Sequence, residues 1–331
     1  MPELRPAPIT DRAVRRPHGL TRFATSGIPD ERRIPLWEQH NARSLVGLRA
    51  QTLGDAPFQG VELNLNLPTL HLARVRGTPH VVERDHRQIA EHPAEGVVAY
   101  FILRGTGHFN HRGGREALSA GQGILCDVDQ PFSRDLSAGV DELAVKFPRT
   151  TLKELTGTSN LAGPRVFSFR GTAPDATHAG ALAQTVGGAM SGDLLEWDAL
   201  EQRVVDLLGH MLGNAGSPAG HVSAAEVFIA SHFATPGLSA GRLAAAVGIS
   251  ERQLSRLFAD SGRSVPQAIL EARLQAAREF MASPDHASTP LSEVAARHGF
   301  ASQEYFTRSY RAHFSTTPLR DRKELLAAAG F

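Results

Sequence analysis

The chain has 331 residues, of which 41% are hydrophobic and 21% are charged, and its formal net charge at pH 7 is +1. This length is sufficient for two domains, each with its own hydrophobic core. The near-zero net charge argues neither for nor against a nucleic-acid partner, so charge has to be examined locally. The single cysteine, Cys126, excludes an internal disulfide and a zinc site made of several cysteines, and it favours a reducing, cytoplasmic location.

The chain begins with MPELRPAPITDRAVRRPHGL, which is rich in proline and arginine and contains no apolar stretch. We therefore expect residues 1–20 to be disordered and to contain no signal peptide. No stretch elsewhere approaches the roughly 20 apolar residues that a membrane-spanning helix needs, which predicts that the chain has no membrane partner.

Residues 21–170 have the pattern of a β-domain. Glycine and proline divide them into short strand-like segments, at 61–77, 96–111, 122–132 and 140–147. In VELNLNL, at the start of the first segment, apolar and polar residues alternate as in a half-buried strand. The glycines of RGTGHF predict a hairpin within the second segment. Short strands with turn signals predict a β-sandwich or barrel, preceded here by a helix over residues 29–48.

Residues 171–213 change to a helical pattern. The apolar residues of EWDALEQRVVDLLGHMLGNAG are spaced by three and four and form one stripe, made of Trp197, Leu200, Val204, Leu207, Leu208 and Met211. The next nine residues, NAGSPAGHV at 214–222, are small and polar, which is typical of a linker between domains.

The remaining residues, 223–331, contain one small helix twice. The segment SERQLSRLFADSG begins at Ser250, and SQEYFTRSYRAHF begins at Ser302, 52 positions later. Three further positions correspond in the two segments: Leu254 with Phe306, Arg256 with Arg308, and Phe258 with Tyr310. At 100° per residue, both helices bury an apolar face and expose a face that carries arginine.

Each of these helices follows a short helix and a glycine turn, at Gly248 and Gly299. This arrangement is a helix-turn-helix, whose second helix lies in the major groove of DNA. We predict two such units, at about 238–262 and 291–314, in an all-α domain. Between them, VPQAILEARLQAAREFMASP predicts a helix roughly 30 Å long. Successive major grooves on one face of DNA lie about 34 Å apart, so this helix can separate two recognition helices.

The stretches that carry this pattern are GISERQLSRLFADSGRSVPQAILEARLQAA (248–277) and GFASQEYFTRSYRAHFSTTPLRDRKE (299–324). They resemble the DNA-binding domain of the AraC/XylS family of bacterial transcription regulators. The resemblance implies sequence-specific binding to operator or promoter DNA, as an activator or a repressor. In the family a glycine usually follows the helix-ending phenylalanine, where this chain has Ser315, and a usual tyrosine is replaced beside Asp321. These departures predict a different helix C-cap within the same fold.

The resemblance places DNA contacts on the outward faces of the two recognition helices. The predicted base contacts are Arg252, Ser255 and Arg256 in the first helix, and Gln303, Glu304, Thr307 and Arg308 in the second. Arginine fits the O6 and N7 acceptors of guanine, and the carboxylate of Glu304 fits the amino group of cytosine. Arg263 and Arg311 are expected to touch phosphate, which positions the protein without specifying sequence. For Arg256 and Arg308, an intradomain salt bridge or a phosphate contact is the alternative.

Residues 21–170 resemble, through TRFATSGIPDERRIPLWEQH and GQGILCDVDQPFSRDL, the cupin-like domain that precedes the DNA-binding domain in one branch of the family. This resemblance implies control by a small organic effector and a homodimer formed through the helical segment 171–213. RNA polymerase is a further partner that it implies. The predicted fold class is therefore α+β multidomain, with a cupin-like β-barrel or sandwich and flanking helices before the all-α domain.

Effector-binding candidates lie on the strand-like segment YFILRGTGHF. They are Tyr100, Ile102, Arg104 and Phe109, which combine apolar surface with one charged group. The alternative is that the apolar residues form ordinary barrel core and that Arg104 faces solvent.

A cupin-type metal enzyme with a helical appendage is the alternative function. Metal cupins gather histidines and a carboxylate on adjoining strands. His108 and His111 stand three positions apart and thus on opposite faces of a strand, and further histidines lie in a loop-like stretch, at positions 80, 86 and 92. Since no nucleophile lies near a base in the pattern, we expect no catalytic residue, no metal site and no cofactor.

Overall fold

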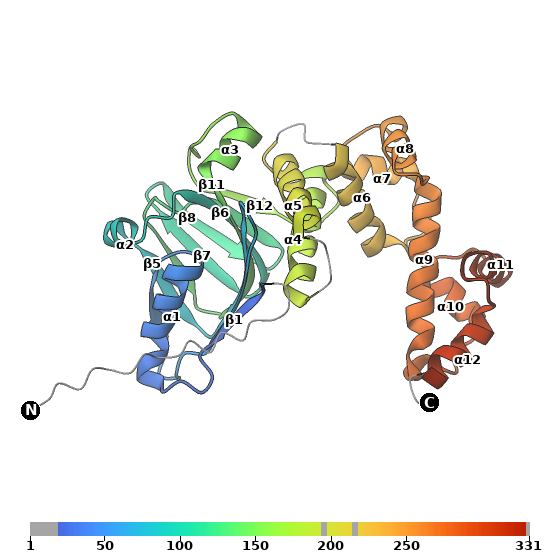
Figure 1. The fold of residues 1–331 in the computed structure, drawn as a ribbon, viewed down its shortest axis with the longest axis horizontal. Helices are drawn as coiled ribbons and strands as arrows, with labels where there is room; N and C mark the ends of the chain where they lie inside the picture. Colours follow the sequence, from blue (N-terminus) through green and yellow to red (C-terminus); the bar gives the residue numbers. More distant parts are fainter. Residues whose placement is uncertain (1–18, 193–196, 214–217, 329–331) are drawn as a thin grey trace, which may run out of the picture. The chain divides into compact units, whose positions relative to one another are not determined.

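The computed structural model describes residues 19–192, 197–213 and 218–328 (Figure 1). They fall into two compact units, the first made of residues 1–171 with 182–215 and the second of residues 172–181 with 216–331. The segment predicted to be disordered lies outside the described residues, except for Gly19 and Leu20.

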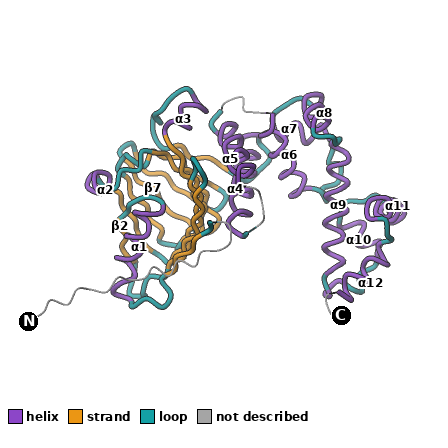
Figure 2. Tube along the Cα trace, viewed as in Figure 1, coloured by secondary structure: helices purple, strands orange, loops and turns teal. Residues whose placement is uncertain are grey.

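The first unit is built on two antiparallel β-sheets, drawn in orange in Figure 2. The larger sheet has seven strands in the spatial order β1 (Thr21–Ala24), β3 (Gly60–Asn66), β4 (His71–Gly77), β11 (Val140–Pro148), β6 (Gly96–Arg104), β9 (Gln122–Asp127) and β12 (Arg165–Ser168). The smaller sheet has the order β2 (Arg49–Thr52), β5 (His80–Arg84), β10 (Phe132–Leu136), β7 (Thr106–His111) and β8 (Gly114–Ser119).

The core of this unit lies between the inner faces of the two sheets. It joins Trp37 of α1 (Asp30–Ser44) with Tyr100 of the larger sheet and with Phe109 and Phe132 of the smaller one. Two shorter helices, α2 (His86–Glu91) and α3 (Arg149–Thr156), follow strands β5 and β11. The predicted cupin-like sandwich is confirmed, because alternating strand residues form one shared apolar interior. The predicted helix is present as α1, but it follows β1 instead of preceding the first strand.

The hairpin predicted at RGTGHF is wrong. β6 pairs with β11 and β9 in the larger sheet, whereas β7 pairs with β10 and β8 in the smaller one. Gly105, which joins them, has a φ of +94°, and a Cβ there would lie 2.5 Å from the carbonyl oxygen of Gly139. The glycine marks a real turn, but the turn carries the chain from one sheet to the other.

The helical pattern after the β-domain forms α4 (Pro174–Ser191) and α5 (Trp197–Met211). The apolar stripe of α5 is buried at every described side chain, namely Leu200, Val204, Leu207, Leu208 and Met211. Because this stripe is already covered within one chain, a homodimer formed through residues 171–213 would have to use other faces of these helices.

The linker prediction overlaps a helix. Residues 214–217 lie outside the described residues, but α6 begins at Pro218 and includes residues 218–222. Proline fits the first position of a helix, where its missing N–H costs no hydrogen bond, so Pro218 starts a helix here rather than continuing a linker.

The described residues from 218 to 328 of the second unit form seven α-helices and a short 3-10 turn (Pro284–His286). The helices are α6 (Pro218–His232), α7 (Ala240–Val247), α8 (Glu251–Asp260), α9 (Val265–Ala282), α10 (Leu291–Arg297), α11 (Gln303–Phe314) and α12 (Pro318–Ala328). Ser250 and Ser302 cap α8 and α11, since their hydroxyls accept hydrogen bonds from the backbone N–H groups of Gln253 (3.2 Å) and Tyr305 (3.1 Å).

Helix α9 is shared by two small cores (Figure 1). Its first half buries Val265 and Ile269 in the small core that it shares with the helices α6, α7 and α8. Its second half contributes Leu274 and Met281 to a cluster with α10 and α11. Its 18 residues span about 27 Å, which agrees with the predicted role as a spacer. No helix within the described ranges combines the length and hydropathy of a membrane span.

Candidate nucleic-acid interface

Helix α8 separates its residues into a buried and an exposed face as the sequence predicts. Leu254, Leu257 and Phe258 are buried against the neighbouring helices. The three predicted base contacts of this helix are all exposed, namely Arg252, Ser255 and Arg256. The apolar face therefore holds the helix in place, and the opposite face is available to a partner.

Helix α11 shows the same separation, with Phe306 and Tyr310 completely buried. Its outer side forms a surface hollow of about 730 Å³. Five predicted DNA contacts line this hollow, namely Gln303, Glu304, Thr307, Arg308 and Arg311, together with Ala312 and Thr317. Residues chosen from the sequence pattern thus converge on one concave surface.

The charges on these two faces are not neutralised by neighbours. Arg252, Arg256, Arg308 and Arg311 form no ion pair with any residue that the structure describes. The guanidinium of Arg308 lies 5.7 Å from the centre of the Tyr305 ring. Hydrogen bonds from its own backbone N–H and from the Ser302 hydroxyl lower the pKa of Glu304, so this carboxylate is ionised at neutral pH.

Arg263 is placed differently from the other predicted contacts. Its guanidinium forms ion pairs with Glu226 of α6 and with Glu271 of α9, the latter at 3.4 Å. Both partners lie inside the second unit, so Arg263 joins α6 to α9. A phosphate contact at this position remains a prediction and would compete with these two carboxylates.

The two departures from the family pattern leave the fold unchanged, and the different helix C-cap expected at Ser315 is not seen. Ser315 ends α11 in the left-handed region, with φ +58° and ψ 16°, where a glycine is the usual residue. Asp321 of α12 is buried and accepts hydrogen bonds from the Tyr310 hydroxyl (2.6 Å) and from Arg278 of α9 (2.8 Å). Asp321, in the stretch that carries the second departure, therefore takes part in a polar link between α9, α11 and α12.

The two halves of the chain match two family models. Residues 243–324 match the model of a helix-turn-helix domain, and residues 37–213 match the AraC-binding-like domain. The chain belongs to the AraC family of transcription regulators. It is a sequence-specific DNA-binding regulator with an effector-binding domain ahead of its DNA-binding domain, and the alternative of a cupin-type enzyme has no support.

The chain is also similar to individual proteins. The chain is 26% identical over 272 residues to the transcriptional activator NphR of a Rhodococcus species, which covers 77% of this chain and 78% of NphR. Over 91 residues it is 36% identical to the HTH-type transcriptional regulator CdhR of Pseudomonas aeruginosa, or 27% of this chain and 26% of CdhR. The crystal structure of the AraC-like transcriptional activator CuxR aligns with a TM-score of 0.48 and 17% identity, covering 77% of this chain and 94% of CuxR.

A second candidate site lies in the first unit of this AraC-family chain, as a cavity of about 1120 Å³ at one end of the β-sandwich. Its wall includes Phe109 and His111 of β7, Cys126 of β9, Phe132 of β10 and residues 160–164. The rings of Phe109 and Phe132 stack with their centres 5.0 Å apart. This mixture of apolar wall and a few polar groups is typical of sites for small organic molecules.

The predicted effector-binding residues are not gathered at this cavity. Phe109 lines it, whereas Ile102 and Arg104 line a much smaller cavity of about 10 Å³. Tyr100 is buried in the core under the guanidinium of Arg134, which lies 4.2 Å from its ring centre. Tyr100, Ile102 and Arg104 are alternate residues on one face of β6, so they follow one another along the strand instead of gathering at one point. Phe109 lies in the other sheet, because the chain changes sheet at Gly105.

Several residues of the cavity wall were not predicted from the sequence. Arg84 of β5 is fully buried, which lowers the pKa of its guanidinium, and it donates hydrogen bonds to the carbonyls of Val128, Gly47 (2.7 Å) and His92 (2.8 Å). His111 accepts a hydrogen bond from the Gly113 N–H at Nδ1 (3.1 Å), so the neutral ring carries its proton on Nε2. Strand alternation was a usable signal for His111, whereas nothing local marks Arg84 as buried.

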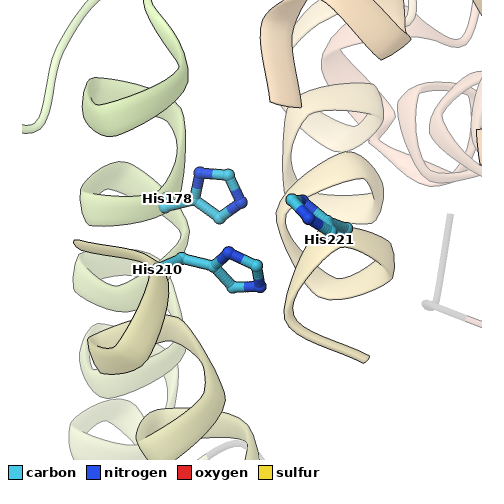
Figure 3. Close-up of side chains that lie close together, drawn as sticks. All are labelled: His178, His210 and His221. Carbon is cyan, nitrogen blue, oxygen red and sulfur yellow. The ribbon is translucent and has the colours of Figure 1, made fainter. Parts of the chain in front are cut away.

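The second unit also contains a histidine pair, His178 of α4 and His221 of α6 (Figure 3). Their ring centres are 5.4 Å apart in a T-shaped arrangement, and His178 donates from Nδ1 to the Pro174 carbonyl (2.8 Å). Figure 3 also labels His210 of α5, a residue of the first unit.

Proposed function

We propose that α8 and α11 enter two successive major grooves of the operator and read different base sequences. In this proposal the base contacts are Arg252, Ser255, Arg256, Gln303, Glu304, Thr307 and Arg308, and the phosphate contacts are Arg263 and Arg311. The observation that supports it most directly concerns α8 and α11, the second helices of the two helix-turn-helix units. Each exposes a face whose arginines form no ion pair with a described residue, and α9 separates the two helices.

The two faces differ in chemistry, and because of this difference we expect the operator to have a direction, with one half-site for each face. The α8 face offers two arginines and a serine, which favour guanine acceptors. The α11 face sets the ionised Glu304 one turn from Arg308, which favours a cytosine amino group beside a guanine. We therefore expect two unlike half-sites in direct orientation rather than a palindrome.

Replacing Arg308 with alanine tests the base-reading role. We expect a loss of about 1–3 kcal/mol in binding to the native operator, and relaxed discrimination at one base position. The measurement is a binding titration at fixed salt against the operator and its single-base variants. Arg320→Ala is the matched control, because Arg320 is exposed on α12 and bonded to Glu324 (2.9 Å). Unchanged discrimination at every position in Arg308→Ala would rule the role out.

We further propose that the cavity at Phe109, His111, Cys126 and Phe132 holds a small organic effector. Its volume and its stacked phenylalanine wall support this assignment. In the same proposal the chain acts in the cytoplasm as a homodimer, contacts RNA polymerase when it regulates a promoter, and catalyses no reaction. Effector binding then changes DNA binding by favouring one of two conformational states.

A further inference from the structure

The two helix-turn-helix units touch each other at a place outside α9. Phe233, which directly follows α6, belongs to the first helix-turn-helix unit, because α6 packs on α7 and α8. His298 and Gly299 form the turn between α10 and α11 in the second helix-turn-helix unit. Arg273 lies between them on α9. We call the contact of Phe233, Arg273, His298 and Gly299 the clasp.

The backbone part of the clasp is close and specific. Arg273 donates from Nε to the carbonyl oxygen of Phe233 at 2.8 Å. Gly299 has a φ of +77°, and a Cβ placed on it would lie 3.1 Å from the same carbonyl oxygen and 3.2 Å from Cα of Ala234. The chain after α6 therefore packs directly on the turn of the second helix-turn-helix unit, where a side chain at position 299 would collide with it.

The ring part of the clasp adds an apolar contact. The rings of Phe233 and His298 are parallel to within 5°, with centres 6.0 Å apart. His298 is buried, and its Nδ1 donates to the Val294 carbonyl at 2.7 Å. The ring of His298 also lies edge-on to the ring of Phe280 of α9, with centres 5.3 Å apart and an angle of 66° between the planes. Burial lowers the pKa of His298, so the ring is neutral and stacks without the cost of a buried charge.

The clasp has a mechanical consequence for DNA binding. With α9 alone as the connection, bending or twisting of one helix would change the angle between the two units. A second attachment, between the end of α6 and the turn of the second helix-turn-helix unit, opposes that motion. Two recognition helices bind successive grooves well only when their separation and direction are set beforehand, because ordering them on the DNA costs binding energy.

We propose that the clasp is a positioning device that fixes the angle between the two helix-turn-helix units, so that α8 and α11 meet the DNA in one register. Phe233, Arg273, His298 and Gly299 are positioning residues and touch no base. The inference rests on the proposed two-groove function, but its structural part holds in the absence of DNA and is tested there.

The first test measures the distance between α8 and α11 in the full chain without DNA. Nitroxide labels are attached at Ala259→Cys and Ala312→Cys, both exposed, whereas Cys126 is buried and stays unlabelled. Double electron–electron resonance is then recorded with Arg273→Met or Phe233→Ala added. We expect one narrow distance distribution for the parent and a distribution about twice as wide for each clasp variant. Equal widths would overturn the proposal.

The second test uses DNA. Operators with native spacing and with one base pair inserted between the half-sites are titrated with the parent, Arg273→Met and Phe233→Ala. The preference for the native spacing is the ratio of the Kd for the operator with the insertion to the Kd for the native operator. We expect this ratio to be at least about threefold lower in the clasp variants than in the parent. Gln275→Met is the control, since Gln275 is exposed on α9 and bonded to Glu279 (2.9 Å).

The outcomes of the two tests separate the two proposals. Equal weakening on both operators, with the spacing preference unchanged, would reduce the clasp to a contributor to stability and overturn the inference. A narrow parent distribution that widens in the clasp variants, combined with a parent that has no preference for spacing, would uphold the clasp and contradict the two-groove function instead.

Discussion

Glu62 of β3 is buried between the two sheets with no hydrogen-bond partner for either carboxylate oxygen among the described residues. The charged and polar groups around it are His40 of α1, whose Nε2 lies 3.8 Å away, Asn64 on its own strand, and Glu142 of β11. Glu142 is itself bonded to Arg134 of β10 (2.8 Å). Burial, with a smaller contribution from Glu142, raises the pKa of Glu62 from 4.5 to about 7.

This carboxyl group predicts a pH-dependent stability of the first unit. Between pH 4.5 and about 7 the folded chain holds a proton on Glu62 that the unfolded chain has released. The free energy of unfolding therefore falls as the pH rises through this window, by about 3 kcal/mol from this group, and stays level above it. Glu62→Gln removes this dependence, so the stability of the variant relative to the parent should rise between pH 5 and pH 8.

Denaturation of the full chain at several pH values checks this prediction. Glu154→Gln, on the exposed side of α3, is the control and should follow the parent at every pH. A difference between Glu62→Gln and the parent that does not change with pH would show that the buried group does not titrate in this range.

At the scale of single elements, strand β7 offers a test of the proposed effector site. His111 and His108 stand on opposite faces of this strand, and only His111 lines the large cavity. A bound effector raises the melting temperature, because a ligand at 100 times its Kd contributes about 2.7 kcal/mol to the folded state.

The effector is sought by a thermal-shift screen of small organic acids, sugars and aromatic metabolites with the full chain. We expect His111→Leu to lose most of the shift that the hit produces, and the matched variant His108→Leu to keep it. Loss of the shift in both variants alike, or in neither, would place the ligand outside this cavity.

The elements also show how far sequence patterns determine this structure. The apolar spacing around Leu254 and Phe306 and the serine caps at Ser250 and Ser302 predict α8 and α11 correctly, because helix signals are local. The strands that β6 and β7 pair with could not be predicted in this way. A glycine turn has the same sequence pattern whether the next strand returns to its own sheet or crosses to another. Register between distant strands depends on contacts that no local pattern contains.

At the scale of the whole chain, the duplicated helix-turn-helix is the feature from which the sequence alone predicts most about structure and function. It predicts the exposed faces of Arg256 and Arg308, and the family matches confirm its function. The cavity wall was largely missed, because Arg84, Cys126 and Phe132 come from three strands that only the fold brings together. The clasp was missed for the same reason, as Phe233 and Gly299 are 66 positions apart.

In the proposed complex, one chain reads two unlike half-sites in successive major grooves. Guanine-methylation interference on the native operator measures this directly, because methylation at N7 blocks arginine contacts in the major groove. We predict two clusters of interfering guanines per protomer, about one helical turn of DNA apart on the same face, with different sequences in direct orientation, and loss of one guanine from the second cluster in Arg308→Ala. A single short palindrome, contacted by one helix of each protomer, would contradict the two-groove proposal.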